Sequence, residues 1–235
     1  MAIKAVLFDL DGTLVPMDQD VFVGDYFKRL SVKFMSYGYD PQKLIDTIWK
    51  GIAAMMKNSG EKTNQQVFWD TVVSAYGKQI LADKPLFDEF YEQDFDNIKL
   101  VCGYNPQAKE TVRNLKKAGY KVALATNPLF PERATRWRIG WAGLEPADFE
   151  LYTTYENINY CKPNLNYYLE VAKSINVKPE ECLMVGNDVS DDMVAEKVGM
   201  KVFLLTDCLI NSKGEDISKY PNGSFDELVE YIKTL

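Results

Sequence analysis

The first hydrophobic pattern in the chain is a short apolar run at residues 2–8 that stops at a pair of acids. The run ends at Asp9, and Asp11 and Gly12 follow directly after it. A continuous apolar run followed by acidic and turn-forming residues is typical of a buried strand in a parallel sheet. We therefore expect a central parallel strand whose carboxyl end carries two carboxylates.

Residues 20–97 change to a helical pattern, in which apolar positions recur every three or four residues. Segments with glycine, proline or asparagine interrupt this pattern, which predicts helices over residues 21–37, 41–58, 63–80 and 85–98. The region is also rich in aromatic residues and methionine. We interpret most of these side chains as the interior of a small helical bundle, and a minority as candidates for lining a ligand site.

From residue 105 onward, helical and strand patterns alternate. The pattern predicts strands over residues 120–125, 149–154, 182–185 and 201–205, and helices over residues 107–118, 131–141, 165–175, 191–198 and 225–235. Such alternation indicates an α/β fold with a doubly wound parallel sheet, which is a Rossmann-like core. We predict that residues 1–16 and 102–235 form this core and that residues 17–101 form an inserted α-helical cap domain.

Composition narrows the possible functions. The 235 residues have a net charge of −7, which argues against a nucleic-acid partner because phosphate binding needs an excess of clustered Lys and Arg. The sequence has no histidine, which excludes Ser-His-Asp and Cys-His nucleophile systems and histidine-ligated zinc. The four cysteines have no CxxC spacing, so we expect reduced thiols. No apolar stretch approaches the ~20 residues of a membrane span, and we expect a cytoplasmic protein without membrane contact.

Polar clusters follow three of the predicted strands, and a lysine opens a later helix. The clusters are Asp9-Leu10-Asp11-Gly12-Thr13, Thr126-Asn127 and Gly186-Asn187-Asp188-Val189-Ser190-Asp191-Asp192, and the lysine is Lys162. In a doubly wound sheet the carboxyl ends of the strands meet at one edge, where ligands bind. Several carboxylates gathered there require a cation, and oxygen ligands without His or Cys favour Mg²⁺.

If a phosphate group is the ligand, each residue type acquires a chemical task. Asp9 is a candidate nucleophile that forms an acyl phosphate, and Asp11 is placed to protonate the leaving oxygen and then to deprotonate water. Gly12 lets the chain turn without crowding the phosphate. Asp188 completes the metal site, and Asp192, one helical turn further on, can hold either Lys162 or a metal-bound water.

Thr126, Asn127 and Lys162 are the candidate phosphate-binding residues. The Thr126 hydroxyl and the Asn127 amide offer hydrogen-bond donors to phosphoryl oxygens, and Lys162 opposes the negative charge that accumulates during transfer. Basic residues in the helical region could also contact an anionic substrate tail, although a solvated helix-face charge is the favoured interpretation of each: Lys28, Arg29, Lys33, Lys50 and Lys57.

The order of these motifs resembles that of the haloacid dehalogenase-like (HAD) superfamily of hydrolases. The residues Ala5-Val6-Leu7-Phe8-Asp9-Leu10-Asp11-Gly12-Thr13 are similar to its first motif, hhhDxDGT. Thr126 after Ala123-Leu124-Ala125 resembles the second motif, Lys162-Pro163 the third, and the acidic run from Gly186 to Asp192 the fourth. The helical region lies between the first and second motifs, where members of this family carry a C1-type cap that closes over the substrate.

The resemblance implies specific roles for these residues. Asp9 is then the nucleophile, Asp11 is the general acid and base, and Asp9, Asp188 and the backbone carbonyl of Asp11 are the Mg²⁺ ligands. Thr126, Asn127 and Lys162 are then the residues that bind the transferring phosphoryl group. The choice between Asp188 and Asp192 as the direct metal ligand stays open.

Three functions are compatible with this pattern. The leading hypothesis is a Mg²⁺-dependent phosphatase that acts on a small phosphorylated metabolite through an aspartyl-phosphate intermediate. A phosphomutase of the same superfamily would keep the whole site, and a non-catalytic phosphate- or metal-binding protein would keep the fold. A dehalogenase is disfavoured, since displacement of a halide needs no acid such as Asp11. The sequence identifies neither the substrate nor the oligomeric state.

Overall fold

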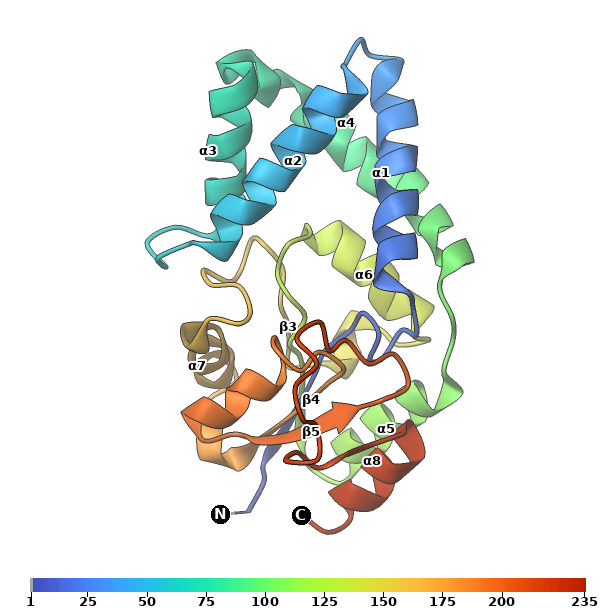
Figure 1. Cartoon of the computed structure of the whole chain (residues 1–235), viewed down its shortest axis with the longest axis vertical. Helices are drawn as coiled ribbons and strands as arrows, with labels where there is room; N and C mark the ends of the chain where they lie inside the picture. The colour runs from blue at the N-terminus through green and yellow to red at the C-terminus, as the bar shows by residue number, and fades with distance from the viewer. Residues whose placement is uncertain (1) are drawn as a thin grey trace.

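A six-stranded parallel sheet forms the centre of one half of the molecule, and a group of helices forms the other half (Figure 1). The computed structural model describes residues 2–235. The strand order is β3-β2-β1-β4-β5-β6, and every pair of neighbours is parallel. The strands are β1 (Ala5–Phe8), β2 (Lys121–Leu124), β3 (Leu151–Tyr152), β4 (Cys182–Gly186), β5 (Lys201–Leu205) and β6 (Asn222–Gly223). The predicted α/β fold with a doubly wound parallel sheet is confirmed.

Alternate side chains of β1 enter two separate hydrophobic clusters on the two faces of the sheet. Val6 and Phe8 belong to one cluster, and Ala5 and Leu7 belong to the other. The first cluster includes residues of α5 (Pro106–Lys117), α6 (Glu132–Trp141) and α8 (Phe225–Ile232), whereas the second includes residues of α7 (Leu165–Ser174) and the 3₁₀ segment Met193–Val198. Because both faces are covered, all four residues of β1 are fully buried.

The helical block, residues 19–101, follows β1 in the chain and lies beyond the carboxyl end of the sheet (Figure 1). Its helices are α1 (Gln19–Met35), α2 (Pro41–Met56), α3 (Asn64–Tyr76) and α4 (Lys84–Glu89). The first three begin at side-chain caps that accept backbone N–H groups: Asp18, Asp40 and Thr63. None of the helices in the described part of the chain combines the length and apolar character that a membrane span requires.

Several element boundaries differ from the prediction. In place of the single helix predicted over residues 85–98, the α-helix ends at Glu89. A π-helical turn, Phe90–Asp94, and a 3₁₀ segment, Phe95–Val101, follow it. The third helix ends at Tyr76, because Gly77 adopts a positive φ of 82° that interrupts the helical path. The helix predicted over residues 191–198 is a 3₁₀ segment that begins at Met193, and β6 was not predicted.

Aromatic packing joins the helical block to the sheet half. The Phe95 ring is fully buried and stacks on Trp141 of α6 with a centroid distance of 5.6 Å and an interplanar angle of 12°. The Trp141 indole N–H also donates to Asp96 Oδ1 at 2.7 Å. Where the two connecting segments pass each other, the Gly103 N–H donates to the Pro16 carbonyl at 2.7 Å. The block is therefore held against α6 and at its two connections.

Candidate active site

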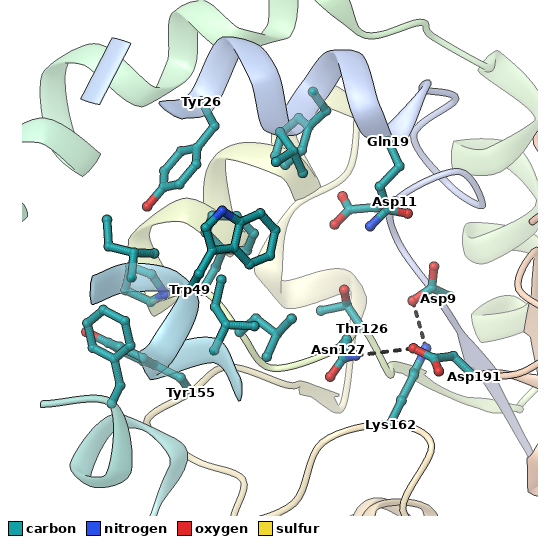
Figure 2. A pocket seen from close by; sticks show the side chains of 18 of the residues that line it. Asp9, Asp11, Gln19, Tyr26, Trp49, Thr126, Asn127, Tyr155, Lys162 and Asp191 are labelled. Atoms are coloured by element: carbon teal, nitrogen blue, oxygen red, sulfur yellow. Dashed lines mark hydrogen bonds and ion pairs between the residues drawn. The ribbon is translucent and has the colours of Figure 1, made fainter. Parts of the chain in front are cut away.

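A cavity of about 200 Å³ lies between the carboxyl end of the sheet and the helical block. Figure 2 shows the carboxylates, Thr126, Asn127 and Lys162 at one end of this cavity and aromatic side chains such as Tyr26, Trp49 and Tyr155 at the other. The catalytic, phosphate-binding and metal-site candidates from the sequence all line it: Asp9, Asp11, Thr126, Asn127, Lys162, Asp188 and Asp192. The parallel strands thus bring together side chains that lie up to 183 positions apart in the chain.

The Lys162 ammonium is buried between two carboxylates. Its Nζ lies 2.8 Å from Asp9 Oδ1 (Figure 2) and 2.6 Å from Asp192 Oδ1. Burial alone would lower the pKa of Lys162, but the negative charges of Asp192 and Asp9 raise this pKa well above its usual value. Lys162 is therefore a fixed positive charge that orients the Asp9 carboxylate.

Asp192 is engaged within the protein through both carboxylate oxygens. Its Oδ1 pairs with Lys162, and its Oδ2 accepts the Asp188 backbone N–H at 3.0 Å. Burial raises the pKa of Asp192 to about 7, against the opposing effect of Lys162. Gly186 at the end of β4 makes room for this arrangement, because a Cβ there would collide with the Asp192 carboxylate. Asp192 thus lies behind Lys162 as a supporting partner.

Asp188 is oriented by the backbone of its own loop. Its Oδ1 accepts the N–H groups of Ser190 at 2.7 Å and Asp191 at 2.9 Å. Within residues 2–235 its other oxygen, Oδ2, has no hydrogen-bond partner, in contrast to Asp192, whose two oxygens are both occupied. Asp188 therefore has a carboxylate oxygen available to a ligand, which Asp192 does not have.

Asp191 is a cavity residue that the sequence analysis did not select. It accepts a hydrogen bond from Asn127 Nδ2 at 3.3 Å (Figure 2). Burial and then repulsion from Asp188 raise the pKa of Asp191 to about 6. Asp191 is thus a partly buried acid that lies close to Asp188 at this end of the cavity.

The turn after β1 is fitted closely to the fourth cluster. Gly12 has a positive φ of 81°, and a Cβ at this position would collide with the side-chain amide of Asn187. The Thr13 hydroxyl donates to Asn187 Oδ1 at 3.0 Å and lies 3.5 Å from Asp9 Oδ2. Asn187 therefore positions the loop that carries both acids, a role that its sequence position within an acidic run did not reveal.

Thr126 and Asn127 extend from the end of β2. The Thr126 carbonyl accepts hydrogen bonds from the Thr153 hydroxyl at 2.6 Å and the Tyr167 hydroxyl at 2.8 Å, which fixes the backbone at this point. The side-chain Oδ1 of Asn127 is buried and has no partner among the described residues. This end of the cavity therefore contains Thr126 on a fixed backbone and an Asn127 amide whose polar groups are not all satisfied by the described part of the chain.

Arg138 forms an ion pair with Asp11 that the sequence did not predict. The Arg138 side chain on α6 is fully buried, its NH1 contacts Asp11 Oδ2, and its guanidinium lies 4.6 Å from the centroid of the Phe130 ring. Asp11 Oδ1 is buried and unpartnered within the described chain. Burial raises the pKa of Asp11, and Arg138 acts in the opposite direction. The sequence offers a weak indication that Arg138 is buried, because Arg138 falls on the apolar stripe of α6 that contains Ala134 and Ile139.

A family model described as haloacid dehalogenase-like hydrolase matches residues 3–199. The chain belongs to this family. The predicted membership of the HAD superfamily and the predicted hydrolase class are thereby confirmed. The glyceraldehyde 3-phosphate phosphatase of Methanocaldococcus jannaschii is 27% identical over 241 residues, which cover 99% of this chain and 98% of that protein.

Solved structures also resemble this HAD protein. A predicted phosphoglycolate phosphatase from Haemophilus somnus aligns with a TM-score of 0.61 at 20% identity over 98% of both chains. A β-phosphoglucomutase from Clostridium difficile has a TM-score of 0.55 at 17% identity over 99% and 96% of the two chains. A HAD-family enzyme from Bacteroides thetaiotaomicron in complex with magnesium and inorganic phosphate has a TM-score of 0.53 at 19% identity over 93% and 98%. These likenesses show a shared fold.

The Arg138–Asp11 pair yields a prediction about stability. The substitution Arg138→Met leaves the Asp11 carboxylate buried without its partner, and we expect the free energy of unfolding to fall by about 3–5 kcal/mol. Adding Asp11→Asn to this variant removes the uncompensated charge and should recover part of the loss. Urea unfolding at neutral pH measures both effects.

The exposed Arg136 on the same helix provides the matched control. It pairs with Glu132 at 3.5 Å on the surface, so Arg136→Met should cost less than about 1 kcal/mol. Equal unfolding free energies for Arg138→Met and Arg136→Met would contradict a structural role for the buried pair.

Proposed function

We propose that this HAD protein is a Mg²⁺-dependent phosphatase that hydrolyses a small phosphorylated metabolite through an aspartyl-phosphate intermediate on Asp9. The observation that carries the proposal is the Asp9 carboxylate, oriented by Lys162 at the end of a cavity, with Asp11 two residues further on. A carboxylate held in this way divides phosphoryl transfer into two displacements. The phosphatase relative, which aligns over nearly the whole chain, supports the same function.

The residues at this end of the cavity fit a hard divalent cation. Among the described residues, no group of three or more His, Cys, Asp or Glu side chains is arranged to hold a metal ion. The ligand set expected from the family requires only two carboxylates, Asp9 and Asp188, together with the Asp11 backbone carbonyl. The remaining positions of Mg²⁺ are normally filled by waters and phosphate oxygens. When bound, Mg²⁺ would offset negative charge on the phosphoryl group.

In the first step the Asp9 carboxylate attacks the phosphorus atom and the bond to the leaving oxygen breaks. For this step Asp11 must leave its pair with Arg138 and carry a proton, which it transfers to that oxygen so that a neutral alcohol departs. Thr126 and Asn127 donate hydrogen bonds to the phosphoryl oxygens. Lys162 holds the Asp9 carboxylate in the correct orientation, while Asp192 supports Lys162 from behind.

In the second step a water molecule attacks the phosphorus atom of the aspartyl phosphate. Asp11, now ionised, accepts a proton from this water. The bond between phosphorus and the Asp9 oxygen breaks, which releases inorganic phosphate and restores the carboxylate. Asp11 therefore acts as acid in the first step and as base in the second, with no requirement for histidine.

A phosphomutase is the second candidate, because a β-phosphoglucomutase shares the fold. A mutase transfers the phosphoryl group from Asp9 back to a sugar phosphate instead of to water. Release of inorganic phosphate therefore separates the two functions. A non-catalytic binding protein would release no phosphate and would form no covalent intermediate.

The substitution Asp9→Asn tests the nucleophile. Because an amide cannot form the acyl phosphate, we expect Mg²⁺-dependent release of phosphate from acetyl phosphate and alkyl phosphates to fall by more than about 10³-fold. A phosphate-release assay with purified wild type and variant measures the loss. Asp20→Asn, at an exposed acid in the first turn of α1, should retain wild-type activity. Undiminished release by Asp9→Asn would refute the assignment.

The substitution Asp11→Asn tests proton transfer to the leaving oxygen. With an alkyl phosphate, whose alkoxide is a strong base, we expect kcat/KM to fall by about 10²–10⁴-fold. With p-nitrophenyl phosphate the leaving group needs no proton, so kcat/KM should fall much less. Equal losses with both esters would show that Asp11 does not serve as the acid.

The substitution Asp188→Asn tests the metal site independently of activity. When the free Mg²⁺ concentration is 100 times the dissociation constant, binding to the folded protein should stabilise it by about 2.7 kcal/mol. We expect Mg²⁺ to raise the thermal midpoint of the wild type and of Asp20→Asn, and to have little effect on Asp188→Asn. A full Mg²⁺ shift in Asp188→Asn would exclude Asp188 as a ligand.

A further inference from the structure

The end of the cavity opposite the carboxylates is an apolar chamber, which we define by its main side chains Phe27, Trp49, Ile52, Phe68 and Phe87. These residues come from all four helices of the helical block. The Phe27 and Trp49 rings pack against each other with a centroid distance of 5.3 Å. Figure 2 shows aromatic rings, with Trp49 among them, grouped away from Asp9. A phosphate monoester bound at Asp9 would extend its alcohol portion toward this chamber.

Positive charge is scarce among the residues that line the cavity. Of the cavity-lining residues in the described part of the chain, Lys162 alone is basic, and it is already paired with Asp9 and Asp192. The basic residues of the helical block that could have contacted an anionic tail are outside the lining: Lys28, Arg29, Lys33, Lys50 and Lys57. Arg29 pairs with Asp25, and Lys33 with Glu89 and Asp94. A second anionic group on the substrate would therefore enter the apolar chamber without a countercharge.

The polar groups near the apolar chamber are mainly uncharged hydroxyls. Tyr26 and Tyr91 share a hydrogen bond with 2.8 Å between their hydroxyl oxygens. Burial raises the pKa of both, and it raises the pKa of Tyr155 to about 12, so all three remain neutral. Asp88 is the charged residue that the helical block contributes to the lining, and it is exposed to solvent, which screens it.

We propose that the substrate is a phosphate monoester of a bulky, uncharged aromatic alcohol. This proposal rests on the phosphatase function proposed above and adds the chemical class of the leaving group. An aromatic ring gains from burial and from edge-to-face contacts with rings such as Trp49 and Phe68. A carboxylate or second phosphate would lose its hydration without gaining a partner. A cationic group could contact the ring faces, but it would lose its hydration with only the screened charge of Asp88 as a counter-ion.

The test compares four esters of primary alcohols: 2-phenylethyl phosphate, n-propyl phosphate, 3-(phosphonooxy)propanoate and phosphocholine. Each ester releases a primary alcohol. Differences in kcat/KM therefore report mainly on how the protein recognises the leaving group. We expect kcat/KM for 2-phenylethyl phosphate to exceed that for n-propyl phosphate by at least about tenfold, because a hydrophobic pocket favours the substrate with more apolar surface. The anionic and the cationic ester should be no better than n-propyl phosphate.

A pair of variants connects this preference to the apolar chamber. Trp49 is 47% exposed, so Trp49→Ala removes a wall of the chamber at little risk to folding. It should reduce the ratio of kcat/KM for the phenylethyl and propyl esters by about fivefold or more. Tyr37→Ala, at an aromatic side chain that is 46% exposed and outside the cavity, should leave the ratio unchanged.

The outcomes separate the two proposals. Preference for the anionic or cationic ester, or an unchanged ratio in Trp49→Ala, overturns the aromatic substrate class while the phosphatase function stands. Absence of phosphate release from all four esters and from acetyl phosphate, with Mg²⁺ present and the protein folded, overturns the phosphatase function and the substrate class together.

Discussion

The buried Lys162 ammonium is the interaction on which the candidate site depends. A charge removed from water at this depth is tolerated only because Asp9 and Asp192 both contact it. These three residues come from the end of β1, from the segment before α7 and from the loop after β4. The requirement to neutralise one ammonium therefore fixes the relative positions of three distant segments and orients the Asp9 carboxylate before any substrate arrives.

Much of the sheet and of this charge cluster could be predicted from the sequence, because both follow from simple patterns. Buried parallel strands appear as uninterrupted apolar runs, and their carboxyl ends must meet at one edge. Hence Asp9, Thr126 and Asp188 were expected to converge. Lys162 was selected through the order of the motifs, since nothing in its local sequence marks a lysine for burial.

The residues that the sequence did not reveal are those whose roles depend on packing between distant elements. Arg138 resembles its exposed neighbours Arg133 and Arg136 in sequence, and burial is decided by the approach of Asp11 from another part of the chain. Asn187 supports Gly12 through shape, which has no sequence signature. β6 has only two residues and pairs with one neighbour, so no hydrophobic pattern could indicate it.

The helical block shows a related limit of pattern analysis. Its aromatic residues were interpreted mainly as the interior of a bundle, and many of them do pack in the core, such as Phe34 and Phe95. Others, including Phe27, both pack in the core and form a cavity wall. Helical periodicity identifies an apolar face but does not tell whether that face meets another helix or a ligand.

The two acids of the first motif are held from opposite layers of the protein. Asp11 is held by Arg138 of α6, which packs in the cluster around Phe8, whereas Asp9 is held by Lys162, which directly precedes α7 in the cluster around Leu7. The packing of each layer therefore acts most directly on one acid, while the charges of Asp9 and Lys162 still reach Asp11. In the proposed mechanism, evolution can therefore act on protonation of the departing oxygen from one layer and on the nucleophile from the other.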